Sequence, residues 1–133
     1  MKTKAVLTQT EVTQILAAAR QDAISNNWAV SIAVVDDGGH LLGFERLDGA
    51  SPASSYIGIE KARTAALGRR ESKSYEESVN GGRTAFLSAP LLTSLEGGVP
   101  VIFDGQVIGA VGVSGVQAAQ DAQVAKAGVA AIG

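Results

Sequence analysis

Two glycine-containing turns constrain the fold of this chain more than any other feature of its sequence. "AVSIAVVDDGGHLLGFERL" and "VPVIFDGQVIGAVGVSG" each place such a turn between two segments rich in β-branched residues. Glycine reaches the positive φ angles of tight turns at no steric cost, and Asp-Gly is a preferred two-residue turn between antiparallel strands. The sequence therefore predicts two β-hairpins and, with them, an antiparallel sheet.

A helical pattern precedes the first hairpin. "TQTE", from Thr8 to Glu11, is a capping box, in which each of the two side chains accepts a backbone N–H of the other residue. Apolar residues then recur at helical spacing, which predicts a helix over residues 10–26.

Two further helices are predicted after the hairpins. Ser51 is a good N-cap and Pro52 suits the first helical position, where no N–H is needed, so a second helix begins there and ends near Arg70. A third helix is expected over residues 117–132. Residues 71–98 carry a weak pattern, with a short helix at "SYEESVN" and breaks at Gly and Pro.

The order of these elements predicts a single α+β domain over residues 1–133, in which helices cover an antiparallel sheet. In the first hairpin, a symmetric loop across Asp37–Gly38 predicts Val35 opposite His40. His40 and Arg46 then share one face of the sheet, about 20 Å apart at ~3.3 Å per residue.

Composition excludes several classes of protein. The net charge of −2 gives no basic excess for nucleic acid, and the absence of cysteine excludes thiolate metal sites and disulfides. No apolar run approaches the ~20 residues of a membrane span, and the first residues do not resemble a signal peptide, so we expect a cytoplasmic protein with no membrane partner. Apolar residues make up 46% of the chain, which favours a homo-oligomer that buries part of its surface between subunits.

Three stretches together resemble the GlcG/HbpS family of haem-binding-like proteins. They are "VVDDGGHLLGFERLDGA", "IEKARTAALGRR" and "GGVPVIFDGQVIGAVGVSG", the last followed by Asp121. The resemblance runs from about Leu7 to Gly128 and extends to the C-terminal domain of PduO-type corrinoid adenosyltransferases. It implies a profilin-like α+β fold with a five-stranded antiparallel sheet and helices on its faces. It also implies homo-oligomers from dimer to octamer, and haem or another tetrapyrrole as the cofactor of some members.

Haem iron needs an axial ligand, and the candidates here are His40, Tyr56, Tyr75 and Met1. With one histidine, a single copy cannot provide two imidazoles. A lone histidine at a turn is also well explained as a local hydrogen-bonding residue, and both interpretations of His40 stay open. We predict no metal site: the carboxylates of the first hairpin can supply oxygen ligands, but their alternation along the strand separates them.

A second interpretation is a cofactor-independent lyase or isomerase that acts on a small carboxylate-bearing metabolite. Arg46 precedes the second helix, whose N-terminal N–H groups attract anions, so Arg46, Ser51 and Ser54 can hold a carboxylate. The simpler alternative is a salt bridge from Arg46 to Asp48 or to the second helix.

In that enzyme, Lys61 is an anion contact or a desolvated base, and His40 or a neighbouring subunit's carboxylate moves the proton. The alternative for Lys61 is a solvated lysine on the helix surface. Gly97, Gly98 and Ser114 are further candidate ligand contacts, because glycines expose backbone N–H groups, although tight turns and bulges are the favoured explanation of the glycines.

The first hypothesis is thus a small-ligand-binding protein, the second an enzyme, and the third a non-catalytic oligomeric accessory subunit. A single site is expected at the Arg46 end of the first hairpin, unless a neighbouring subunit brings its own His40 there.

Overall fold

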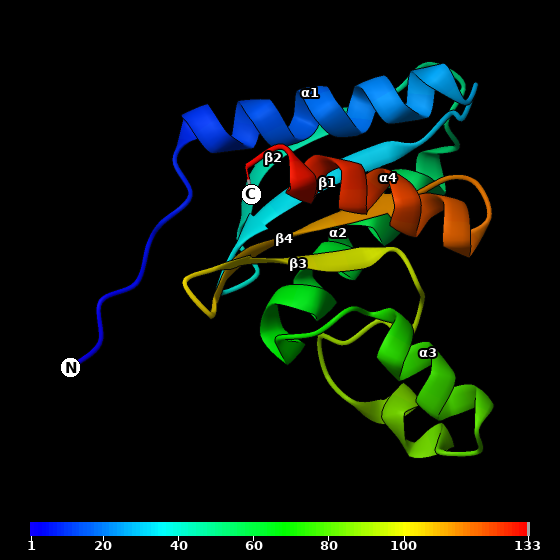
Figure 1. Ribbon diagram of the computed structural model, residues 1–133. Helices are drawn as coiled ribbons and strands as arrows, with labels where there is room; N and C mark the ends of the chain where they lie inside the picture. Colours follow the sequence, from blue (N-terminus) through cyan, green and yellow to red (C-terminus); the bar gives the residue numbers. More distant parts are fainter. Residues whose placement is uncertain (133) are drawn as a thin grey trace.

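The computed structural model describes residues 1–132, which form an α+β fold. In chain order the elements are α1 (Gln9–Ser25), β1 (Ser31–Asp36), β2 (Leu41–Arg46), α2 (Pro52–Gly68), α3 (Lys73–Asn80), the 3-10 helix η1 (Thr84–Ser88), β3 (Gly98–Phe103), β4 (Gln106–Ser114) and α4 (Ala118–Ala130). The strands form one antiparallel sheet in the order β2-β1-β4-β3 (Figure 1). Within residues 1–132, no helix is both long and apolar enough to cross a bilayer.

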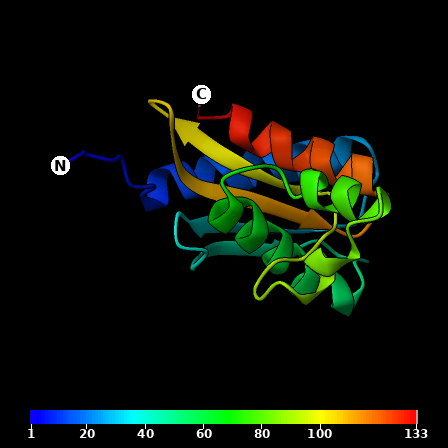
Figure 2. The same cartoon turned by 90° about the horizontal axis from the view of Figure 1, so that it is seen from below.

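The sheet is the middle of three layers. Helices α1 and α4 lie on one face and α2 on the other, with α3 and η1 beside α2 (Figures 1 and 2). The larger apolar cluster lies under α1 and α4 and includes Ile15, Ile32, Val111 and Val124. The cluster under α2 is built mostly of alanines, so α2 packs much closer to the sheet.

The predicted helix starts and the second hairpin are confirmed. The Glu11 carboxylate accepts the Thr8 N–H at 2.9 Å, and the Ser51 hydroxyl caps α2 by accepting the Ser54 N–H at 3.3 Å. In the turn between β3 and β4, Asp104 and Gly105 have φ angles of 53° and 70°. Two positive φ angles at the centre of a two-residue loop match the twist of the flanking strands.

The expected register of the first hairpin is wrong. Asp36 uses its carboxylate to accept the N–H groups of Gly38 and His40, both at 2.9 Å, and Gly39 adopts a φ of 80°. This turn takes more residues than a symmetric loop would, and the register shifts so that Val35 pairs with Leu41. His40 therefore leaves the strand and its side chain points into solvent, 81% exposed.

The sheet of residues 1–132 has four strands, where the resemblance implied five. The outer edge of β3 explains why no further strand pairs there. The Gly98 N–H is donated to the Ser72 hydroxyl at 2.8 Å, and the Gly98 carbonyl accepts the Ser72 N–H at 3.0 Å. Pro100, the next outward-facing residue, has no N–H to donate. The short helix predicted at "SYEESVN" is confirmed as α3.

Helix α2 approaches β4 closely because two glycines face each other. A Cβ atom added at Gly112 would overlap the Gly58 carbonyl oxygen and the Ala62 nitrogen, which are backbone atoms that cannot rotate away. A Cβ added at Gly58 would lie 3.4 Å from the Ser31 carbonyl oxygen, an ordinary contact. The contact therefore excludes a side chain at Gly112 and accepts one at Gly58.

We predict that Gly112→Ala lowers the free energy of unfolding by about 1–3 kcal/mol or more, because the backbone of α2 must move away from β4. Gly58→Ala is the matched control from the opposite side of the same contact, and a helical Gly-to-Ala change gains roughly 0.5–1 kcal/mol. Urea denaturation of both variants measures the difference. Equal stabilities would show that the close approach of α2 to the sheet is not what Gly112 provides.

Candidate functional site

Polar side chains gather at the end of the sheet where α2 begins. Arg46 of β2, Ser31 of β1 and Ser114 of β4 are neighbours across the three strands. The Ser31 and Ser54 hydroxyls lie 2.7 Å apart, which places this row under the first turn of α2. The sequence prediction that Arg46 lies beside the start of the second helix is confirmed.

Most hydroxyls in this row are already used by the fold. Ser54 is buried and donates its hydroxyl to the Ser51 carbonyl oxygen at 2.6 Å, and Ser31 is buried beside it. Ser114 is also buried. Ser31 and Ser54 therefore fix the start of α2 on the sheet, and Ser51 alone among the predicted serine contacts is exposed.

Arg46 is exposed and donates its Nε–H to the Ala50 carbonyl oxygen at 3.1 Å. Among residues 1–132, neither Arg46 nor Asp48 takes part in an ion pair. The expected alternative, a salt bridge from Arg46 to Asp48 or to α2, is therefore wrong. The guanidinium stays anchored by one backbone contact, with its charge open to a ligand or partner.

Lys61 is buried, so its interpretation as a solvated surface lysine is wrong. Its ammonium group lies 3.1 Å from an Asp121 carboxylate oxygen and donates to the Val113 carbonyl oxygen at 3.0 Å. The second Asp121 oxygen accepts the Val116 N–H at 3.1 Å. Burial raises the pKa of the Asp121 carboxyl, while the Lys61 charge and the Val116 N–H oppose that rise. The pair joins α2 to α4 past the end of the sheet.

Gly97 and Gly98 make room for Lys61. A Cβ added at Gly97 would lie 2.8 Å from the Lys61 Nζ, and one added at Gly98 would overlap the Lys61 carbonyl. The Gly97 carbonyl also accepts the Val113 N–H at 3.0 Å. Close packing against α2 accounts for Gly98, while Gly97 also adopts a φ of 137°, a backbone conformation that side chains rarely allow.

His40 lies at the opposite end of β2 from Arg46. Its Nδ1 atom lies 3.1 and 3.2 Å from the two Asp36 carboxylate oxygens, and its ring is exposed. His40, Arg46 and Lys61 therefore do not converge within one copy. Nor do three or more His, Asp or Glu side chains gather into a metal-binding group within residues 1–132.

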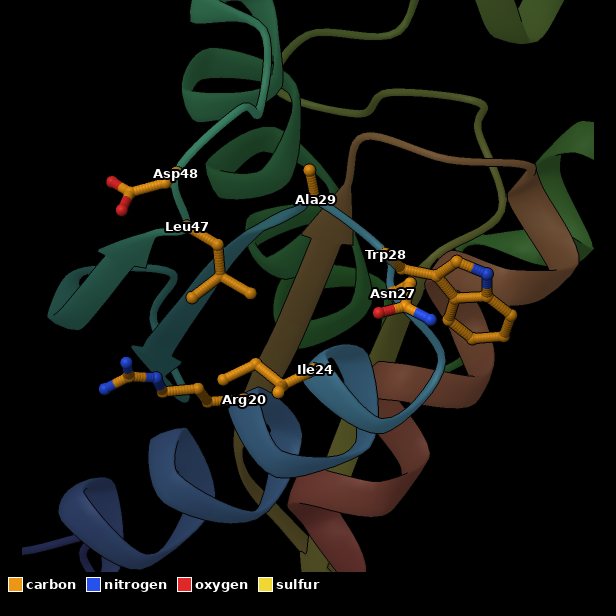
Figure 3. Close-up of a pocket in the computed structure, with 7 residues that line it drawn as sticks. All are labelled: Arg20, Ile24, Asn27, Trp28, Ala29, Leu47 and Asp48. Atoms are coloured by element: carbon orange, nitrogen blue, oxygen red, sulfur yellow. The ribbon is translucent and has the colours of Figure 1, made fainter.

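Two hollows of the surface run along α1. One has a volume of about 340 Å³ and is lined by Arg20, Ile24, Asn27, Trp28, Ala29, Leu47 and Asp48 (Figure 3). The other has about 520 Å³ and is lined by Thr13, Leu16, Ala17, Arg20, Gln21, Ile24 and Glu45. Because Arg20 and Ile24 line both, we treat them as one feature, the α1–β2 groove.

A third, smaller hollow of about 190 Å³ is mostly apolar and lies between the N-terminal segment and the β3–β4 hairpin, with Leu7, Phe103 and Ile108 among its lining residues. His40, Arg46 and Lys61 line none of these three hollows.

Sequence reasoning missed two features of this region. Asp121 was noted as part of the family pattern, but its role as the partner of Lys61 was not predicted. The contact of the Asp36 carboxylate with His40 was not predicted either. The spacing of Asp36 and His40 was the available signal, since a turn of that length returns the histidine to the carboxylate.

The chain is similar to known proteins over nearly all of its length. Residues 7–130 match a family model described as haem degrading protein HbpS-like. The protein GlcG of Escherichia coli K12 is 67% identical over 114 residues, which cover 86% of this chain and 85% of GlcG.

Solved structures share the fold. A double mutant of Streptomyces reticuli HbpS superposes with a TM-score of 0.90 at 31% identity, covering 100% of this chain and 91% of that one. The PduOC protein, solved as a complex with haem, has a TM-score of 0.86 at 26% identity, covering 96% and 95% of the two chains.

We predict that Asp121→Ala costs about 3–5 kcal/mol of stability, because it leaves the Lys61 charge buried without its partner. The double variant Lys61→Met with Asp121→Leu should lose much less than the sum of the single variants Lys61→Met and Asp121→Leu. Urea denaturation of the wild type, these two single variants and the double variant forms a double-mutant cycle. Additive losses would show that the two side chains are energetically independent and that their contact does not hold α4 to α2.

Proposed function

The chain belongs to the HbpS-like family, and on that premise we propose that it binds haem or another tetrapyrrole, with His40 as the ligand of the iron. The relatives support the choice of ligand, since PduOC was solved as a haem complex and the family is described as haem degrading. Bound iron would supply redox and ligand-exchange chemistry, and the chain itself would supply the ligand and its orientation.

One observation carries the proposal: the Asp36 carboxylate holds His40 Nδ1 at 3.1 and 3.2 Å. Metal-ligating histidines commonly donate their other ring N–H to a carboxylate, which fixes the tautomer and the direction of the ring. With Nδ1 held in this way, Nε2 becomes the nitrogen that is free to bind, and it lies on an exposed side chain.

The surroundings of His40 suit the rest of a tetrapyrrole. Leu41 and Leu67 are exposed apolar residues, and Leu67 lies beside the turn at Gly39. Arg63, whose guanidinium pairs with Glu60, also packs against Gly39, and the Arg69 guanidinium donates to the Asp37 carbonyl oxygen. Apolar contact for the ring and guanidinium groups for its carboxylates therefore lie around one histidine.

Within residues 1–132, no carboxylate orients the other candidate ligands in this way. Tyr75 is buried against the ring of Phe86, with ring centres 5.3 Å apart, and its hydroxyl faces Gly68. Tyr56 is 77% exposed on α2 and has no side-chain hydrogen bond within residues 1–132 that would orient it. Met1, the fourth candidate, is fully exposed. His40 is the best placed of the four.

We predict that the purified protein gives a saturable Soret band with stoichiometric hemin. His40→Ala should weaken binding by more than the roughly 10–100-fold that loss of a supporting outer contact costs. Tyr56→Phe is the control and should leave the titration unchanged. The absence of a saturable band in the wild type would refute haem binding, and a band unaltered in His40→Ala would remove His40 as the ligand.

Asp36→Asn tests the orienting contact separately. We expect the haem complex to form with a lower iron–imidazole stretching frequency in the resonance Raman spectrum of the ferrous state, because a neutral amide leaves the imidazole less basic than a carboxylate does. An identical frequency in the wild type and the variant would mean that Asp36 serves the turn alone.

A further inference from the structure

The α1–β2 groove combines an apolar floor with charged residues at its margins. Figure 3 shows the Leu47 and Ile24 side chains between those of Asp48 and Arg20, and all four residues line the same hollow. Ile24 is 49% exposed, and Leu47 is partly buried against the core. These two side chains offer apolar surface to a ligand.

The charges that line the groove leave a net negative charge. Its acidic and basic side chains are Arg20, Glu45 and Asp48, one positive and two negative. The Arg20 guanidinium lies 3.2 Å from a Glu45 carboxylate oxygen, so these two groups neutralise each other. Asp48 takes part in no ion pair within residues 1–132. Its carboxylate is therefore the charge that a ligand can compensate.

The end of helix α1 adds to this negative potential. Ile24 and Asn27 line the same hollow as Asp48, so the hollow lies at the C-terminal end of α1. The helix dipole places about half a negative charge at that end, and basic side chains in the last turn commonly compensate it. The last turn of α1 contains no basic residue. A cation in this hollow is therefore attracted both by the helix and by Asp48.

Arg46 does not oppose such a cation, although it is only two residues from Asp48. It pairs with Ser31 in the sheet register, and the Ser31 hydroxyl lies 2.7 Å from that of Ser54 in α2. Residues directly opposite each other on antiparallel strands share a face of the sheet. Arg46 therefore lies on the α2 face, whereas Asp48 lines a hollow against α1.

We propose that the α1–β2 groove binds a primary alkylamine, with the ammonium group at Asp48 and the alkyl chain on Ile24 and Leu47. A primary ammonium group has three hydrogen-bond donors and no acceptor. The Asp48 carboxylate and the Asn27 amide oxygen are acceptors that line this hollow. Those acceptors favour a primary over a quaternary ammonium group, because the latter has no N–H to donate.

The dimensions of the groove suit an unbranched amine. Its two hollows, of about 340 and 520 Å³, fall within the range of about 300–1,000 Å³ that is usual for small-ligand sites. Past Arg20, the second hollow is lined by Leu16 and Ala17 as well as Ile24, so an alkyl chain can continue along α1. His40 lines neither hollow. The inference therefore goes beyond the proposed function and does not depend on it.

The only tryptophan of the chain, Trp28, lines the hollow beside Asp48 and reports its occupation. We expect n-hexylammonium to change the Trp28 fluorescence of the haem-free protein saturably. Each methylene group added between butylammonium and hexylammonium should tighten binding by up to about fourfold. Hexanoate and n-hexyltrimethylammonium should bind about tenfold more weakly or worse, because neither donates a charge-assisted hydrogen bond to Asp48.

Asp48→Asn removes the charge and keeps the size of the side chain, so it should weaken hexylammonium binding by about tenfold or more. Asp104→Asn is the matched control. It makes the same change at an exposed carboxylate in the β3–β4 turn that lines none of the three hollows, and it should leave binding unchanged.

Three outcomes would overturn the proposal. The first is equal binding of hexylammonium and either hexanoate or n-hexyltrimethylammonium, and the second is unaltered binding in Asp48→Asn. The third is the absence of a saturable change both in Trp28 fluorescence and in the amide NMR resonances of Ile24 and Asn27. Failure of hemin to bind would leave these results unchanged.

Discussion

The close approach of α2 to β3 and β4 is the constraint on which the rest of the structure depends. Gly112 and Gly98 lack side chains where the α2 backbone passes, and alanines fill the remaining space. At that distance a long side chain on the inner face of α2 cannot lie flat on the sheet. Lys61 instead extends past the sheet end and reaches Asp121, so the burial of this charge is a consequence of helix packing.

The two hairpins differ in how tightly they are packed and in which groups they expose. The β3–β4 hairpin is tightly packed: one edge is protected by Ser72, and its glycines admit α2. The β1–β2 hairpin carries the exposed features, namely the His40–Asp36 pair at its turn and the free edge of β2. The closest packing and the exposed groups therefore lie at opposite ends of the strand order β2-β1-β4-β3.

The features that sequence predicted correctly are local ones. The Ser51 cap, the capping box at Thr8 and the Asp104-Gly105 turn each depend on residues within three or four positions of one another, and such signals can be read directly. The first hairpin was predicted as a hairpin, but its register was not, because one Asp36 carboxylate binds two N–H groups and lengthens the turn.

The candidate site was harder to predict because it depends on contacts between segments that are far apart in the sequence. Lys61 owes its burial to Gly97, Gly98 and Asp121, which lie on other segments, so its sequence neighbourhood resembles that of a surface lysine. Arg46 was placed correctly because β2 runs directly into α2. The family could be recognised from the order of its motifs. Which side chains lie close together could be seen only in the three-dimensional structure.

The Lys61–Asp121 contact has a consequence for the lifetime of the folded chain. The two residues are 60 positions apart, and α3, β3 and β4 lie between them. The entropy of closing so long a loop must be overcome before the contact can form, so we expect it to form late in folding. Interactions that form after the transition state slow unfolding and leave the folding rate almost unchanged. We therefore expect this buried charge pair to slow unfolding and to prolong the lifetime of the folded chain.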